Sequence, residues 1–336
     1  MAKHVCIIYT GGTIGMVRGE NGYIPAQTRL EESLRAIGDL FKPGMPELTV
    51  IQFDPLLDSS NVSIPEWNKI GSTIAENYHS FDGFVVLHGT DTMSYSASAL
   101  AFELENLDKP VIFTGAQIPL CEIRSDGSSN IISAVMIAAE GIVKEVCIYF
   151  DGKLIRGCRS TKVSSDQFAA FASPNFGLLA DVGISVQYHN PGGLPEKDGA
   201  FAFRPLEEIP VGIIKMFPGI QIRHFKSIMT EQLRGVVLET FGAGNIPSSS
   251  TGEMIPLIRE AYENGTLVVV CSQCIQGAVT LGAYESSKAL RDIGAVTGKD
   301  MTTEAALTKL IYLFSRHYPL DQIRQLMVEN LRGEIS

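Results

Sequence analysis

Two glycine-containing segments carry the hydroxyl side chains of this chain that are best placed to do chemistry. The first, 10–15, reads Thr-Gly-Gly-Thr-Ile-Gly, and the second, 88–92, reads His-Gly-Thr-Asp-Thr. Each directly follows a short apolar run. Glycine lets the backbone approach a ligand closely and leaves N–H groups accessible. Loops of this kind that end two strands of one sheet can converge over a single pocket.

Each segment also has a simpler interpretation. The Walker spacing and the G-x-G-x-x-G spacing are both absent from 10–15, which disfavours nucleotide binding. A tight turn explains the glycines there but not the threonines beside them. In the second segment, Asp91 or Thr92 could be the N-cap of a following helix. Asp58-Ser59-Ser60 likewise suits a cap, and a lone lysine such as Lys162 is usually solvated.

Short apolar runs, continuous rather than alternating, recur along the chain. They predict strands covered on both faces, hence a largely parallel sheet. The runs are Val5–Tyr9, Phe84–Leu87, Pro110–Phe113, Val146–Phe150, Val236–Leu238 and Leu267–Val270. Active sites of open α/β sheets lie outside the carboxyl ends of the strands, so the loops after the first strands are where chemistry is expected.

Helical stretches separate these runs, which predicts a doubly wound α/β fold. Ser63-Ile64-Pro65-Glu66 has the pattern of a capping box with proline in the first turn. Further helices are predicted at Ser94–Leu107, Ile131–Ala139, Met254–Asn264, Ser286–Ile293, Thr302–Ser315 and Leu320–Leu331.

The length of 336 residues exceeds one ordinary core, which predicts two domains. Residues His189–Gly199 are rich in glycine and proline, as a linker would be. We expect a larger N-terminal catalytic domain with a mostly parallel sheet at 1–188, a linker at 189–211, and a smaller α/β C-terminal domain at 212–336.

The composition excludes several classes of protein. The net charge is −10 with scattered Lys and Arg, which argues against nucleic acid and anionic membranes as partners. No run reaches the roughly 18 apolar residues that span a bilayer, and no signal peptide is recognised, so the cytoplasm is expected. The C-x-x-C of Cys271 and Cys274 ends a strand run, whereas redox motifs of this kind usually open a helix. The histidines are too scattered for an obvious metal site.

Taken together and in order, these segments resemble the bacterial-type L-asparaginase family over essentially the whole chain. The subtype looks like the cytoplasmic type I enzymes, because of the absent signal peptide and the segment Ser272-Gln273-Cys274. The matching segments are Thr10–Gly15, Asp58-Ser59, His88–Thr92, Thr114–Gln117, Arg124–Gly127, Lys162 and Gly242–Asn245. The resemblance implies hydrolysis of L-asparagine to L-aspartate and ammonia, without a metal or an organic cofactor.

The resemblance also implies catalytic roles. Thr13 is the nucleophile that forms an acyl-enzyme ester, and it needs a base because a threonine hydroxyl is a very weak acid. Tyr23 stands where the family has a tyrosine on a mobile loop. Thr90, Asp91 and Lys162 are expected to form a hydrogen-bonded relay. Which of Tyr23 and Lys162 is the general base stays open.

Other matched residues are expected to bind the substrate, which has an ammonium and a carboxylate. Asp91 suits the ammonium, and Ser59 and Ser60 suit the carboxylate, with Asp58 orienting their loop. Backbone N–H groups of the glycine-rich loops and of Ala116 could stabilise the oxyanion.

In relatives the asparagine that matches Asn245 reaches the active site of a neighbouring subunit, which implies a homodimer or a homotetramer. Type I enzymes also carry an allosteric asparagine site, matched here by Ser272-Gln273-Cys274. Its expected arginine is replaced by Glu239, followed by Thr240. Because an acid would repel a ligand carboxylate, we expect allostery to be altered or lost.

Three alternatives stay open beside the main hypothesis. A mixed glutaminase-asparaginase has the same machinery and a roomier pocket. An ammonia-supplying subunit of a tRNA-dependent amidotransferase is disfavoured, because those relatives carry an additional domain before the threonine motif. A pure amino-acid-binding protein would bind without turnover.

Overall fold

The computed structural model describes residues 2–20, 22–25, 30–189, 192–282 and 285–336. The chain forms two compact units. The first is made of Met1–Ser173, Gly177–Gly192 and Lys197–Pro205, and the second of Pro174–Phe176, Gly193–Glu196 and Leu206–Ser336. The domain limits drawn from the sequence stay a prediction, and residues 190–191 of the expected linker lie outside the described residues.

An eight-stranded sheet forms the centre of the first unit, in the order β13-β12-β9-β8-β7-β5-β1-β4. Strands β4, β1, β5, β7 and β8 run parallel, and β9, β12 and β13 continue the sheet antiparallel. Their bounds are β1 (His4–Gly11), β4 (Glu47–Leu57), β5 (Gly83–Leu87), β7 (Val111–Thr114), β8 (Val146–Phe150), β9 (Lys153–Arg156), β12 (Ala180–Val182) and β13 (Val186–Tyr188). The mostly parallel sheet predicted from the sequence is confirmed.

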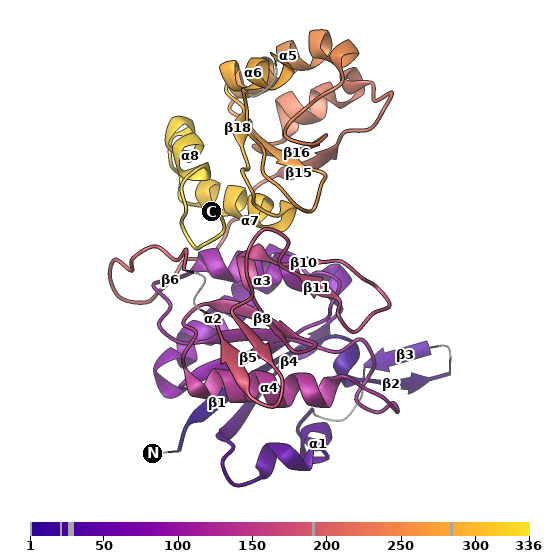
Figure 1. Ribbon diagram of the computed structural model, residues 1–336, viewed down its shortest axis with the longest axis vertical. Coiled ribbons are helices and arrows are strands. Elements are labelled where there is room, and N and C mark those ends of the chain that lie inside the picture. The colour runs from indigo at the N-terminus through magenta and orange to yellow at the C-terminus, as the bar shows by residue number, and fades with distance from the viewer. Residues whose placement is uncertain (1, 21, 26–29, 190–191, 283–284) are drawn as a thin grey trace. The chain divides into compact units, whose positions relative to one another are not determined.

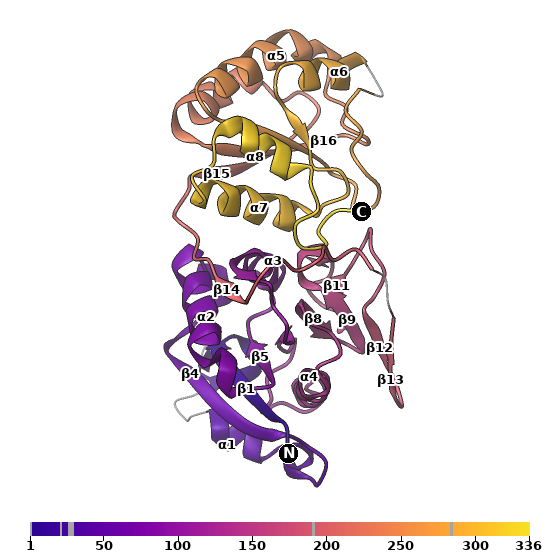
Figure 2. The ribbon, with the colours of Figure 1, turned by 90° about the vertical axis from the view of Figure 1, so that its left-hand side faces the viewer.

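Helices cover both faces of this sheet, as a doubly wound fold requires. Helices α2 and α3 lie on one face and α4 on the other, with the sheet between them (Figure 2). Ile131 and Val135 of α4 join Val5 and Ile7 of β1 in one fully buried cluster. The helices are α1 (Leu30–Arg35), α2 (Ile64–Asn77), α3 (Met93–Glu103) and α4 (Gly127–Glu140). The predicted capping box of Ser63 and Glu66 begins α2.

The helix predicted at Ser94–Leu107 is wrong at its end. It stops at Glu103, because the next two residues form β6 (Leu104–Glu105), which pairs antiparallel with β14 (Ala202–Phe203). Asn106 then adopts a left-handed conformation with φ 56°, which a helix does not continue. Strand β14 lies inside the stretch 189–211 expected as a linker, so that stretch is not loop throughout.

The second unit has its own parallel sheet, in the order β15-β16-β17-β18. Figures 1 and 2 show this sheet between α5 and α6 on one side and α7 on the other. The elements are β15 (Val211–Lys215), β16 (Gly235–Thr240), β17 (Leu267–Ser272), β18 (Val296–Thr297), α5 (Ser248–Glu263), α6 (Glu285–Asp292), α7 (Thr303–Ser315) and α8 (Leu320–Met327). A smaller α/β unit was predicted and is confirmed.

The last predicted helix, Leu320–Leu331, is also too long. It ends at Met327 because the N–H groups of Leu331 and Arg332 donate to the Glu334 carboxylate instead of continuing the helix. Glu334 is fully buried and pairs with the fully buried Lys309 at 2.6 Å. Among the helices of the described residues, none has the length and apolarity needed to cross a membrane.

Candidate active site

Glycines bring three loops of the first unit into contact. Gly12 has φ 92°, and a Cβ at this position would lie 2.5 Å from the Cα of Gly89. A Cβ on Gly89 would in turn lie 2.5 Å from the Oγ of Ser59. Because real Cβ atoms do not approach so closely, only glycine fits at both positions. The loops after β1, β4 and β5 therefore meet, and they carry Thr13, Ser59 and Thr90.

Thr13 begins a short 3-10 helix, η1 (Thr13–Gly15), directly after the loop of β1. The side chain is half-buried. Its hydroxyl makes no hydrogen bond to any other residue that the structure describes. Gly11 holds the start of this turn with φ 133° and packs against the backbone of Leu57. The backbone at Thr13 is thus tightly placed while its hydroxyl stays unengaged.

Thr90, by contrast, sits inside a hydrogen-bonded cluster and is 7% exposed. Lys162 donates from Nζ to Thr90 Oγ1 at 2.9 Å and to Asp91 Oδ1 at 2.7 Å. Thr90 donates to Gln117 Oε1 at 3.3 Å. The Lys162 side chain is 19% exposed, so it is not the solvated surface lysine of the simpler interpretation. The structure therefore brings Thr90, Asp91 and Lys162 together.

Lys162 reaches this cluster from a short hairpin. Strand β10 (Thr161–Lys162) pairs antiparallel with β11 (Phe171–Ala172), so the lysine is held opposite Phe171. Phe171 packs on Phe150 at the end of β8. This anchoring fixes the base of a long, flexible side chain, which reduces the entropy lost when its ammonium binds two partners.

The loop after β7 supplies Ala116, which is 1% exposed, and Gln117. Asp126, the residue before α4, braces this loop by accepting from the backbone N–H groups of Gln117 and Ile118 at 3.0 and 3.1 Å. Asn130 adds a bond from Nδ2 to the carbonyl of Gly115 at 2.9 Å. From the sequence alone, Asp126 and Asn130 had no predicted role. An aspartate just before a helix was the available signal, but it predicts a cap rather than a brace.

A series of buried side-chain hydrogen bonds holds the start of the loop after β5. His88 is 1% exposed; its Nδ1 lies 2.7 Å from the carbonyl oxygen of Gly89, and its Nε2 lies 3.0 Å from Ser96 Oγ. Trp67 Nε1 donates to the same Ser96 Oγ at 3.0 Å. A neutral ring that donates from Nδ1 and accepts at Nε2 satisfies every group in this chain. Burial lowers the pKa of His88 to about 4, in agreement with a neutral ring.

The capping interpretations apply to Asp58 but not to Thr92. Asp58 caps a 3-10 helix, η3 (Ser59–Asn61), by accepting from the N–H of Ser60 at 3.0 Å. Thr92 occupies the N-cap position of α3 without a capping side-chain bond. It donates instead to the Ser59 carbonyl at 2.7 Å, which ties the loop after β5 to the loop after β4. Ser59 is buried, whereas Asp58 and Ser60 are exposed.

Tyr23 lies on a separate hairpin of the first unit, made by β2 (Met16–Gly19) and β3 (Gly22–Pro25) (Figure 1). It is 45% exposed and pairs across the hairpin with Arg18. A hydrogen bond from Arg18 to the Tyr23 side chain raises the pKa of that guanidinium. The contact recorded for Tyr23 in this structure is therefore with Arg18, and Thr13 is not among its partners.

The predicted residues of the second unit lie at the ends of β16 and β17. Glu239 and Thr240 stand opposite Cys271 and Ser272 in the parallel register, and Gln273 donates to the Glu239 carbonyl at 2.9 Å. The Glu239 carboxylate accepts from the Thr303 hydroxyl at 2.6 Å and lies 3.7 Å from Lys215 Nζ. Cys274 is exposed, and its N–H donates to Ser272 Oγ at 3.0 Å.

Asn245 lies in a tight turn, where it pairs with Phe241 through two backbone hydrogen bonds. Cys271 of the C-x-x-C is buried, and burial raises the pKa of its thiol to about 12, which opposes the thiolate that redox chemistry needs. Within the described part of the chain, no group of three or more His, Cys, Asp or Glu side chains could hold a metal ion.

Comparison with known proteins gives matches over both units. A family model described as "Asparaginase, N-terminal" matches residues 4–192, and one described as "Glutaminase/Asparaginase C-terminal domain" matches residues 210–327. The chain is 42% identical over 334 residues to L-asparaginase 1 of Escherichia coli K12, covering 99% of this chain and 98% of the relative.

Two solved structures extend this comparison. The crystal structure of L-asparaginase I from Vibrio cholerae superposes with a TM-score of 0.92 at 41% identity, covering 100% of both chains. The thermostable L-asparaginase from Thermococcus kodakarensis superposes with a TM-score of 0.90 at 31% identity, covering 99% of both chains.

Proposed function

The chain belongs to the asparaginase family, and from that premise we propose that it hydrolyses L-asparagine to L-aspartate and ammonia through an ester on Thr13. One observation supports this more than any other. Thr13 has a hydroxyl unengaged by the described residues, and the contact of Gly12 with Gly89 brings its loop against the loop that carries the Thr90–Lys162–Asp91 cluster. A free nucleophile next to a fixed polar cluster is what acyl transfer needs.

In the first step, the Thr13 oxygen attacks the side-chain amide carbon of asparagine, and a base removes its proton. We assign the base to Tyr23 rather than Lys162. Lys162 already donates to Thr90 and to Asp91, which suits a cation that polarises the cluster. Tyr23 is on an exposed hairpin, so a movement of that hairpin toward Thr13 would be needed. The base then passes this proton to the amide nitrogen, which leaves as ammonia, and water cleaves the ester to release aspartate.

The negative charge that develops on the amide oxygen needs donors that are already in place. The backbone around Ala116 suits this role, because Asp126 holds the neighbouring N–H groups and leaves little freedom to the loop. A rigid donor is worth more in catalysis than a mobile one, since no reorganisation is required during the reaction.

The two charged groups of the substrate fit the loops after β4 and β5. Asp91 is 67% exposed at its side chain and keeps one carboxylate oxygen beyond the bond to Lys162, so it can accept from the ammonium. Ser59 and Ser60 offer hydroxyl groups to the carboxylate. Asp58 already accepts from the N–H of Ser60, so we propose that it shapes the loop and that this N–H is not available to the substrate.

Trapping the intermediate tests the proposed function. The enzyme is mixed with asparagine, quenched in acid within the first turnovers, digested, and mapped by mass spectrometry. We expect an aspartyl ester on the peptide that contains Thr13. The Thr13→Ser variant keeps a hydroxyl and should still form it, whereas Thr13→Ala should not. An ester on any other residue, or turnover by Thr13→Ala at the wild-type rate, would refute the assignment.

A mixed glutaminase-asparaginase is a second candidate, favoured by the description of the family model for residues 210–327. Both substrates would use the same threonine, so trapping does not separate them. Ammonia release from glutamine and asparagine at equal concentration does. Equal kcat/KM values would favour the mixed enzyme, and a large preference for asparagine would exclude it.

We also propose a homodimer or homotetramer in the cytoplasm, with Asn245 donated to a neighbouring subunit. Light scattering measures the oligomer, and a monomer with full activity would exclude shared sites.

At the ends of β16 and β17, Glu239 makes the expected allosteric site unsuited to a ligand carboxylate. We therefore expect a hyperbolic asparagine saturation curve, and a sigmoidal one would contradict this.

A further inference from the structure

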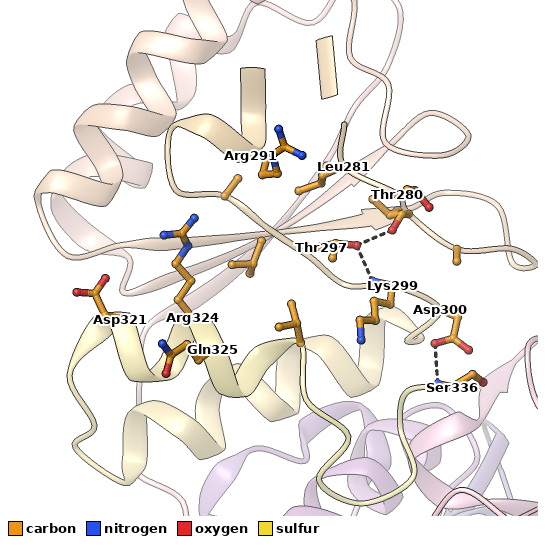
Figure 3. Close-up of a pocket in the computed structure, with 15 residues that line it drawn as sticks. Thr280, Leu281, Arg291, Thr297, Lys299, Asp300, Asp321, Arg324, Gln325 and Ser336 are labelled. Carbon is orange, nitrogen blue, oxygen red and sulfur yellow. Dashed lines mark hydrogen bonds between the residues drawn. The ribbon is translucent and has the colours of Figure 1, made fainter. Parts of the chain in front are cut away.

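The second unit contains a cavity of about 920 Å³ that the proposed reaction does not use. It lies between α6, β18, α8 and the segment 278–281, all of which belong to that unit. Figure 3 shows Arg291 of α6, Arg324 of α8 and Lys299 of the turn after β18 around it. Cavities of this size suit a small molecule.

Apolar side chains form much of the wall. They include Val279, Leu281, Ala295, Val296 and Val328. Val279, Ala295 and Val296 are buried, and Val279 and Ala295 belong to the hydrophobic core cluster of this unit. The wall is therefore backed by packed residues, and an apolar ligand body would be desolvated there without rearrangement of the core.

The acidic side chains around the cavity have hydrogen-bond partners, whereas two of the cations have no carboxylate partner in the part of the chain that the structure describes. Of its two acidic side chains, Asp321 accepts from the Tyr262 hydroxyl at 2.8 Å and Asp300 accepts from the N–H of Ser336 at 3.1 Å. Neither Lys299 nor Arg324 forms an ion pair with a carboxylate of the described residues. Arg324 packs on the Tyr262 ring at 5.9 Å, so its charge is oriented but not neutralised.

Lys299 is held in an unusual backbone conformation. Its φ is 50°, in the left-handed region that a lysine rarely adopts. Three hydrogen bonds keep it there: Lys299 N–H to Thr297 Oγ1 at 2.9 Å, Thr297 Oγ1 to the Val279 carbonyl at 2.6 Å, and Val279 N–H to the Lys299 carbonyl at 2.9 Å. This network fixes the direction in which the Lys299 side chain extends from the backbone.

We propose that this cavity binds a monocarboxylate with an apolar body, whose carboxylate meets either Lys299 or Arg324 and whose body lies along the apolar wall between them. Cations without carboxylate partners favour an anion, and the apolar wall favours a ligand that is more than a small ion. The cavity is formed by the second unit and Thr13 belongs to the first, and the proposal does not depend on the proposed reaction.

Calorimetry with matched ligands tests the chemistry. Octanoate has both features, octanamide lacks the charge, and acetate lacks the apolar body. We expect octanoate to bind at least about tenfold more tightly than either analogue. Octanamide binding equal to octanoate would overturn the role of the cations. The absence of octanoate binding would overturn the site.

Variants test the position. Arg324→Gln removes one charge, and Lys299→Asn removes the other while keeping a residue that tolerates positive φ. The variant that removes the cation in contact with the carboxylate should weaken octanoate binding about tenfold or more. Arg259→Gln, which changes an exposed arginine of α5 outside the cavity, is the matched control and should leave binding unchanged. Unaltered binding by both cavity variants would overturn the proposal.

A measurement on the wild-type protein guards against variants that fail to fold. The photoreactive carboxylate 4-benzoylbenzoate is added, irradiated, and its attachment mapped by peptide mass spectrometry. Labelling should fall on peptides that contain 278–281, 295–299 or 321–328, and excess octanoate should suppress it. Labelling confined to other peptides would contradict the assignment.

Discussion

The loop after β1 and the loop after β5 each carry a threonine of the candidate site, and the two hydroxyl groups differ in their hydrogen bonding. Thr90 is 7% exposed and lies between Lys162 and Gln117, whereas the Thr13 hydroxyl bonds no described residue. Contact between Gly12 and Gly89 brings the two loops together. The difference indicates that one hydroxyl belongs to a fixed network and that the other is left available to react.

Removing Lys162 should have the largest effect, because it removes the cation that binds Thr90 and Asp91 in the loop after β5, here called the fixed loop. For Lys162→Met we expect kcat to fall about 10³-fold with a much smaller change in KM. The exposed Lys144 gives the control Lys144→Met, which should be unchanged. Steady-state kinetics measures both. A loss below tenfold would show that the Thr90 cluster is structural and would remove the contrast between the loops.

Acid should weaken the support behind the fixed loop. His88 has a pKa of about 4 in the folded protein, against about 6.5 when exposed. Between these values the unfolded chain holds more protons, so stability falls as pH drops from about 7 to about 4, by roughly 3 kcal/mol. Urea unfolding at several pH values measures this. The His88→Gln variant should lose less stability over the same range, and an identical pH dependence would contradict the neutral buried ring.

The loop after β1, here called the free loop, carries Thr13. Deprotonation of Thr13 depends on Tyr23 if that residue is the base. Tyr23→Phe removes one hydroxyl from an exposed hairpin, so stability should change by less than about 0.5 kcal/mol. We expect kcat to fall about 10²-fold. Tyr318→Phe, at an exposed tyrosine of the second unit, is the control. If Tyr23→Phe kept more than half of the wild-type kcat, the base role would pass to Lys162.

Ser96 should give the smallest effect, because it acts on the fixed loop only through His88. Ser96→Ala leaves Trp67 Nε1 and His88 Nε2 without their shared partner, at a cost of about 1–3 kcal/mol. We expect kcat to fall severalfold. Ser72→Ala changes a serine that bonds only within α2 and should be nearly neutral. Equal unfolding midpoints for the two variants would refute the support role.

Much of the fold was predictable because burial on both faces leaves a direct trace in sequence. The central strands are continuous apolar runs, and β1, β5, β7 and β8 were all predicted within a few residues. The edge strand β4 was not, since only one of its eleven residues is buried and its pattern is mixed. Helix ends were missed where distant partners decide them, as Phe203 does for the end of α3.

The sequence by itself determined which loops form the candidate site, because glycine and threonine at strand ends are local features. Only the tertiary structure decided how they are arranged. The chain from Trp67 through Ser96 to His88, and the brace from Asp126 to Gln117, join residues whose types alone suggest core packing and capping. Hydrogen bonds between segments far apart in the chain have no periodicity, so no sequence pattern predicts them.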